Sequence, residues 1–193
     1  MRYVLLLAAA LLNLGWLCFA PRIPLPLQLA IPAVSVLLAF PAARRRPRRA
    51  LTALLVYYLC ILVLILFFGG IFHLERGWGS SVQLTPFYTI RNYLIFYRRT
   101  GSFISIYNLL GNFLLFLPFG ILVPIRFEKL RKVWIFLPLT AILICLVEYI
   151  QWRTGTGAAD IDDFLLNLAG AALGYFAAHS LRPPPHPNHA EGG

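Results

Sequence analysis

Seven acidic and carboxamide side chains interrupt three long apolar segments in the second half of the chain. They are Asn108 and Asn112 in the first segment, Glu148 and Gln151 in the second, and Asp162, Asp163 and Asn167 in the third. A polar group in hydrocarbon is costly unless it faces the protein interior or a water-filled cavity. Because these groups lie at matching depths, their pattern predicts one polar site.

The carboxyl groups suggest two kinds of chemistry. Glu148 lies in the apolar sequence AILICLVEYIQW and suits a general acid or base, while Asp163 or Asp162 remains ionised at the wetter helix end. Glu148 and Asp163 are therefore the candidate catalytic residues. Together with Asp160 and Asp162 they also offer the oxygen ligands that a divalent cation accepts. No activated nucleophile, HExxH motif or glycine-rich phosphate loop accompanies them, so the sequence predicts no resident cofactor and leaves catalysis open.

Structural explanations stand beside these functional ones. The two asparagines of the first segment can hydrogen bond between helices, a contact that contributes about 0.6 to 2 kcal/mol. An acidic residue at a helix N-terminus caps free amides, and for Asp162 this is the preferred role. Glu148 requires a partner, which Arg91 or Arg153 can provide as an ion pair.

The composition predicts a membrane protein. Of 193 residues, 60% are hydrophobic and 12% charged, far from the usual globular balance. The net charge of +10 comes from basic residues beside apolar segments, which indicates membrane topology and anionic lipid and argues against nucleic acid. The three cysteines, Cys18, Cys60 and Cys145, lie in apolar runs without paired spacing and are expected as buried free thiols.

An all-α bundle of about six transmembrane helices is expected from the apolar runs. The runs are Tyr3 to Ala20, Leu25 to Ala43, Leu51 to Phe72, Phe103 to Ile125, Val133 to Trp152 and Ile161 to Leu181. Four prolines, at positions 24, 26, 32 and 41, make the second span uncertain, and Pro21 disfavours cleavage of the first run as a signal peptide. We divide the chain into two N-terminal spans and a basic loop (1–50), a four-helix membrane domain (51–181) and a disordered tail (182–193).

The segment between spans three and four mixes aromatic and basic residues, as at a membrane interface. Its later half, around Tyr88 to Tyr97, is expected as a short surface helix. Arg91, Arg98 and Arg99 suit either phosphate recognition or simple interfacial anchoring.

Charge bias orients the predicted bundle. Cytoplasmic termini place eleven of the 17 Lys and Arg residues inside, including the RRRPRR and RFEKLRK loops. The polar residues then meet at the outer leaflet. Their spacings of three or four residues put each pair on one helix face, and Gly170, Gly174 and Ala178 continue that face as a close-packing stripe.

Four ordered blocks resemble the VanZ-like family. They are LTPFYTI (Leu84 to Ile90), NLLGNFLLFLPFG (Asn108 to Gly120), EYIQ (Glu148 to Gln151) and DIDDFLLNLAGAALGY (Asp160 to Tyr175), within roughly Leu51 to Leu181. The resemblance implies a small bacterial integral membrane protein of the cell envelope, and the founding member is associated with resistance to teicoplanin. One departure is Gln83-Leu84-Thr85, where the family commonly has Asn-Leu before Pro-Phe.

Two functional hypotheses follow. In the first, the protein binds a lipid or lipid-linked cell-wall intermediate in an outward-facing polar pocket and contributes to glycopeptide resistance. The expected binding residues are Asn108, Asn112, Glu148, Gln151, Asp162, Asp163, Asn167 and Arg91. In the second, it is a membrane enzyme that uses Glu148 and Asp163 on a lipid-linked substrate. A transporter is a weaker third, because no inverted repeat is visible.

Overall fold

The computed structural model describes residues 47–68 and 82–180, together with 10, 13, 30 and 32–35. Helices dominate this part of the chain: α3 (Pro47–Val63) with the π-helical turn η2 (Leu64–Phe68), α4 (Tyr88–Thr100), α5 (Ile104–Arg126), the 3-10 turn η4 (Glu128–Arg131), α6 (Val133–Thr154) and α7 (Ile161–Ser180). Two short strands, β1 (Val82–Gln83) and β2 (Ala159–Asp160), pair in parallel.

Four stretches of helix are long and apolar enough to cross a membrane: Arg48–Phe67, Ile104–Arg126, Val133–Thr154 and Ile161–Ser180. They overlap the last four spans predicted from the sequence, so the helical membrane class is confirmed. The two N-terminal spans and the tail at 182–193 lie almost entirely outside the described residues. The described positions there include a hydrogen bond in which Ser35 Oγ donates to Asn13 Oδ1 at 2.9 Å.

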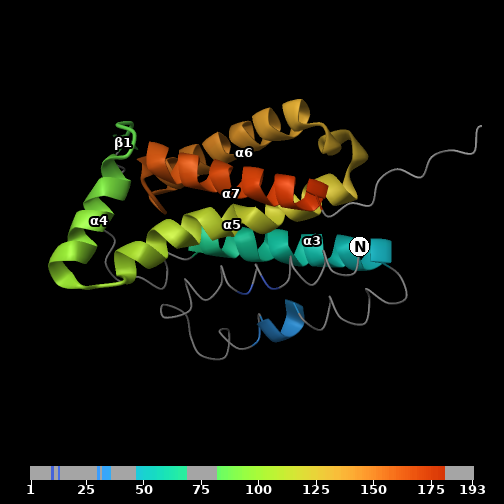
Figure 1. Ribbon diagram of the computed structural model, residues 1–193, viewed down its shortest axis with the longest axis horizontal. Coiled ribbons are helices and arrows are strands. Elements are labelled where there is room, and N and C mark those ends of the chain that lie inside the picture. Colours follow the sequence, from blue (N-terminus) through green and yellow to red (C-terminus); the bar gives the residue numbers. More distant parts are fainter. Residues whose placement is uncertain are drawn as a thin grey trace, which may run out of the picture.

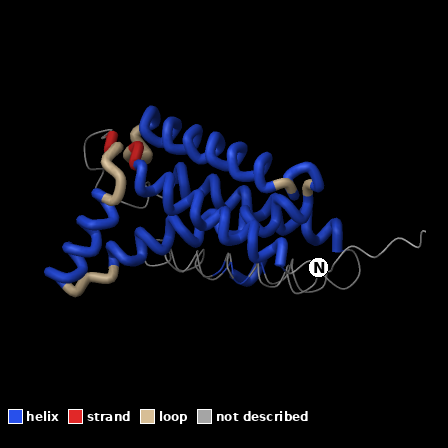
Figure 2. The backbone as a smooth tube through the Cα atoms, turned by 45° about the horizontal axis from the view of Figure 1, so that its top comes forward, coloured by secondary structure: helices blue, strands red, loops and turns tan. Residues whose placement is uncertain are grey.

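The four long helices lie side by side, and α4 crosses one end of their bundle (Figures 1 and 2). Helix α3 runs antiparallel to α5, because Arg126 Nε donates to Thr52 Oγ1 while Tyr58 OH donates to the Leu115 carbonyl. Phe116 and Phe136 are almost fully buried between the helices and belong to the core. This arrangement carries the starts of α5 and α7 and the end of α6 to the same end of the bundle.

Helices α5 and α7 run parallel and touch through their backbones. A Cβ added at Gly170 would overlap the Phe113 carbonyl, and one at Gly174 would overlap the Leu117 carbonyl. On the α5 side, a Cβ at Gly120 would lie 2.8 Å from the Tyr175 backbone nitrogen. The stripe of small residues predicted on α7 is therefore a packing surface for α5.

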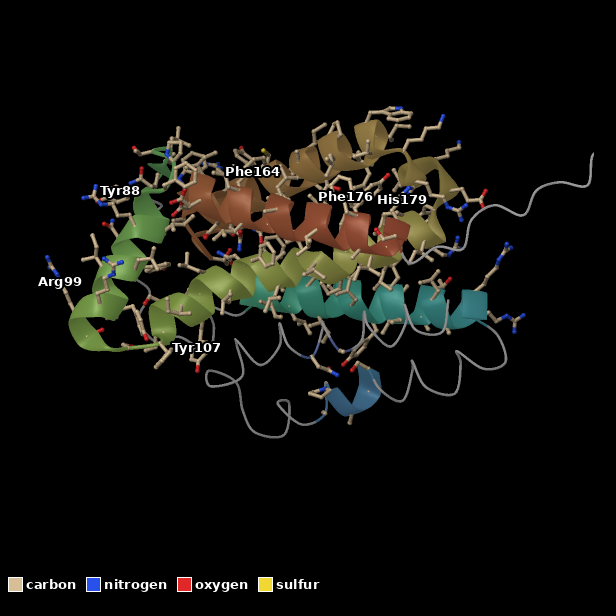
Figure 3. All side chains as sticks on the ribbon, viewed as in Figure 1. Tyr88, Arg99, Tyr107, Phe164, Phe176 and His179 are labelled. Atoms are coloured by element: carbon tan, nitrogen blue, oxygen red, sulfur yellow. The ribbon has the colours of Figure 1, made fainter. Side chains whose placement is uncertain are left out.

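The two ends of the bundle carry different charges. The polar end, where α5 and α7 begin, holds the acidic residues Glu148, Asp160, Asp162 and Asp163 together with Arg153 and the three arginines of α4; Tyr88 and Arg99 mark it in Figure 3. The basic end, marked by His179, holds the cationic residues Arg48, Arg49, Arg126, Lys129, Arg131 and Lys132. The outward orientation of the polar end was predicted from the larger number of Lys and Arg residues on the other side, and that orientation stays a prediction.

The expected burial of the cysteines is wrong for two of them. Cys60 on α3 and Cys145 on α6 are free thiols, as expected, but both are exposed. A helix that is apolar on every side gives no sequence signal for its inward face, because its lipid-facing residues are as hydrophobic as its core. Cys18 lies outside the described residues.

Candidate functional site

The start of α7 is organised by Asp160. Its Oδ1 accepts a hydrogen bond from the Asp162 N–H at 2.8 Å, so Asp160 caps the helix in which Asp162 and Asp163 form the first turn. Its Oδ2 accepts from the Thr89 hydroxyl at 2.5 Å, which attaches α4 to the same point. Asp160 was not among the residues predicted for the binding site. An aspartate directly before an apolar helical run is the N-cap signal that identifies its role.

Asp162 caps a helix other than its own. Its side chain is fully buried, and its two oxygens accept from the Phe87 N–H at 2.5 Å and the Ile90 N–H at 3.0 Å. The first amides of a helix have no partner within that helix, and Phe87, at φ 64, turns the chain into α4 without a side-chain cap of its own. The sequence predicted that Asp162 caps amides, and the helix it caps is α4, 72 residues earlier in the chain.

The turn before α4 also uses the residue that departs from the family pattern. Gln83 pairs with Asp160 in the β1–β2 ladder, and its side-chain Oε1 accepts from the Thr85 N–H at 2.9 Å. Glutamine at this position therefore makes a local contact between side chain and backbone, of the kind that begins a turn.

Asp163 and Glu148 form the second half of the polar cluster. Asp163 accepts a hydrogen bond from the Asn112 side-chain amide of α5. Glu148, which is 9% exposed, accepts from the Asp160 N–H at 3.5 Å, the limit of a hydrogen bond. The charge of Asp163 repels the Glu148 carboxylate, and the charge of Asp160 repels both of them.

No positive side chain balances this cluster within the described residues. The salt bridge found there, Arg131 to Glu128 at 3.3 Å, lies at the basic end. Arg91 is exposed on α4, and Arg153 stacks over the Trp152 ring at 5.9 Å. The ion pair of Glu148 with Arg91 or Arg153, considered from the sequence, is therefore not present.

Among the remaining predicted residues, some make hydrogen bonds in the structure and others make none. Gln151 Nε2 donates to the Leu66 carbonyl at 2.8 Å and so ties α6 to η2. Asn167 is 2% exposed, yet its Oδ1 has no hydrogen-bond partner. Asn108 is partly buried and makes no hydrogen bond to the described residues. The structure thus links Glu148 and Asp162 to Asp160 and links Asn112 to Asp163 at the same helix start, and it leaves Arg91 outside.

The metal hypothesis receives no support from the geometry. Among the residues that the structure describes, no three His, Cys, Asp or Glu side chains are arranged to hold a metal ion. Asp160 and Asp162 direct all four of their carboxylate oxygens at amides or at the Thr89 hydroxyl. A cation in this cluster would compete with the contacts that form the start of two helices.

The bundle of apolar helices with carboxylates and amides gathered at one end defines a helical membrane protein. Residues 54–182 match the model of the VanZ/LLP1 family, and this match contains every residue of the polar cluster. The chain is also 32% identical over 129 residues to Protein VanZ of Enterococcus faecium, an alignment that covers 65% of this chain and 70% of that protein. The chain therefore belongs to the VanZ/LLP1 family. No solved structure matches it.

Proposed function

We propose that the polar end binds the headgroup of a lipid or lipid-linked cell-wall intermediate, and that the protein acts in the cell envelope. One observation carries the proposal: Glu148 and Asp163 place two interacting carboxylates in a largely buried position without a neighbouring positive charge in the described chain. Buried charges are normally paired, and groups that the fold leaves unpaired are candidates for a ligand.

The hydrogen bonds separate structural carboxylates from available ones. Asp160 and Asp162 accept strong hydrogen bonds that form α7, α4 and their junction. Glu148 has only the long contact with the Asp160 amide, and Asp163 has only the Asn112 amide as a side-chain partner. Glu148 and Asp163 therefore have carboxylate oxygens that remain available to accept hydrogen bonds from a bound molecule.

The available groups determine what kind of headgroup fits. The oxygens of Glu148 and Asp163 are mainly hydrogen-bond acceptors, because even a proton shared by the two carboxyl groups leaves most of these oxygens without one, and the unpartnered Asn167 atom is also an acceptor. Asn167 lies one helical turn below Asp163, and helical side chains tilt toward the N-terminus, which directs Asn167 toward that carboxylate. A site with excess acceptors selects a ligand rich in donors. Sugar hydroxyls and ammonium groups, which lipid-linked cell-wall intermediates carry, meet this requirement.

We further propose that this binding contributes to glycopeptide resistance of the teicoplanin type, the property associated with the founding member of the family. The test uses Glu148→Gln and Asp163→Asn, expressed in a susceptible host, with Glu128→Gln as the matched control at the basic end. We expect both site variants to reach normal membrane levels and to lose the protection that the parent protein and the control provide. Unchanged protection by the two site variants would refute the site.

An enzyme remains the second candidate because Glu148 and Asp163 interact while having different partners, as acid–base pairs do. In that case the purified protein converts a lipid-linked substrate, and mass spectrometry detects a product that either variant fails to form. A binding protein instead retains the intermediate unchanged. Recovery of intact intermediate with the parent protein, and its loss with Glu148→Gln, would favour binding over catalysis.

A further inference from the structure

We infer that α4 is a docking surface for anionic phospholipid, whose phosphates bind the exposed arginines of this helix. The inference is independent of the ligand proposed for Glu148 and Asp163. It begins from position: the membrane-crossing helices run along one direction, and α4 runs across their polar end (Figures 1 and 2). A helix placed across the end of a membrane bundle lies along the membrane surface.

The two faces of α4 differ in character. Ile90, Tyr93 and Tyr97 are partly buried, at spacings of three and four residues that put them on one face toward the bundle. Arg91 and Arg98 are exposed and seven residues apart, so they share a different face, with Leu94 between them. Arg99 is also exposed and points away from the other helices in Figure 3.

Charge and exposed apolar surface together select the partner. Helix α4 contains no Asp or Glu, and its three arginines form no ion pair with the described residues. Exposed Leu94 (43%), Phe96 (47%) and Tyr88 (50%) accompany them on the helix. Apolar side chains next to arginines favour the boundary between acyl chains and headgroups, and each basic residue near an anionic surface contributes about 1 kcal/mol. The guanidinium fork also matches a phosphate with two hydrogen bonds.

The helix is attached at both ends, so its arginines are held in place. At its start, Asp162 and Asp160 bind the Phe87 and Ile90 amides and the Thr89 hydroxyl. At its end, Gly101 adopts φ 67 and Tyr97 packs on Phe103 with ring centroids 5.2 Å apart. A surface fixed in this way presents its positive charge to the membrane without first having to order a flexible segment.

The test needs a probe on α4 itself, because the basic end of the bundle also attracts anionic lipid. Exposed Asn92 is changed to Cys in a full-length chain whose three cysteines are replaced by alanine, and is labelled with a fluorophore. The protein is reconstituted in vesicles that contain phosphatidylcholine or phosphatidylglycerol with a nitroxide near the headgroup. We expect phosphatidylglycerol to quench the label several-fold more effectively at equal content.

Matched variants decide whether the arginines cause that preference. The combined change Arg91→Gln, Arg98→Gln and Arg99→Gln is expected to abolish it, while Arg153→Gln, at the same end of the bundle, is expected to preserve it. Thermal melting checks that the triple variant retains its fold, as exposed substitutions should. Equal quenching by the two lipids in the parent chain, no quenching by either, or a preference that survives in the triple variant would each overturn the inference.

Discussion

Asp162 and Asp163 are consecutive residues of α7 whose carboxylates contact different parts of the fold. Asp162 accepts hydrogen bonds from the two backbone amides that begin α4, and Asp163 accepts one from Asn112 of α5. Successive helical residues point about 100° apart, so neighbouring side chains at the start of α7 reach α4 and α5 separately. The first carboxylate is used entirely by the fold, and the second belongs to the candidate site.

Replacing Asp162 with asparagine should destabilise the protein. Asparagine replaces one of the two carboxylate oxygens with an NH2 donor, which would face the Phe87 or the Ile90 N–H, and it removes the charge that favours a helix N-terminus. Loss of a cap costs about 0.5 to 2 kcal/mol. We expect a lower melting temperature and faster amide exchange at the start of α4. Asp163→Asn is the control, and equal effects of the two substitutions would contradict the division of roles.

Glu148→Gln should leave the melting temperature unchanged or raise it. The substitution removes a carboxylate that Asp163 and Asp160 repel, and it loses only a hydrogen bond of 3.5 Å. Residues kept for function often oppose stability in this way. The measurement is thermal unfolding of the purified protein in detergent, with exposed Glu128→Gln as the control. A clear fall in melting temperature for Glu148→Gln alone would identify Glu148 as a structural residue.

Asn112→Asp should be more harmful than Asn112→Ala. Alanine removes the hydrogen bond to Asp163, whereas aspartate replaces the donor with a second acceptor that repels the carboxylate it faces. Like charges buried together cost more than an absent contact. Expression level and melting temperature of the two variants provide the comparison. If aspartate proves as well tolerated as alanine, the contact between Asn112 and Asp163 makes little difference to stability.

The sequence predicts the bundle well because membrane helices are set mainly by apolar length. The predicted boundaries of α5, α6 and α7 lie within two residues of the observed ones, and Gly170 and Gly174 identify the packing face. The positions of Glu148 near the end of α6 and of Asp163 at the start of α7 also predicted that both lie at the same end of the bundle. The partners of Asp162 could not be predicted, because amides at Phe87 and Ile90 carry no sequence signal and the contact spans more than 70 residues.

Gly170→Leu should disrupt the contact between α5 and α7, whereas Ala169→Leu should have little effect. A Cβ at position 170 already overlaps the Phe113 carbonyl, and a backbone atom cannot rotate away as a flexible side chain can. Overpacking usually costs about 1 to 3 kcal/mol, and we expect a value at the upper end. Ala169 is the neighbouring residue and is exposed, so leucine there adds apolar surface that lipid can cover. Both variants are compared by membrane expression and by melting temperature in detergent.

Because Asp163 lies on the same α7 face, separation of the two helices should also weaken its hydrogen bond to Asn112. Normal expression and stability of Gly170→Leu would mean that α5 and α7 do not touch at this glycine.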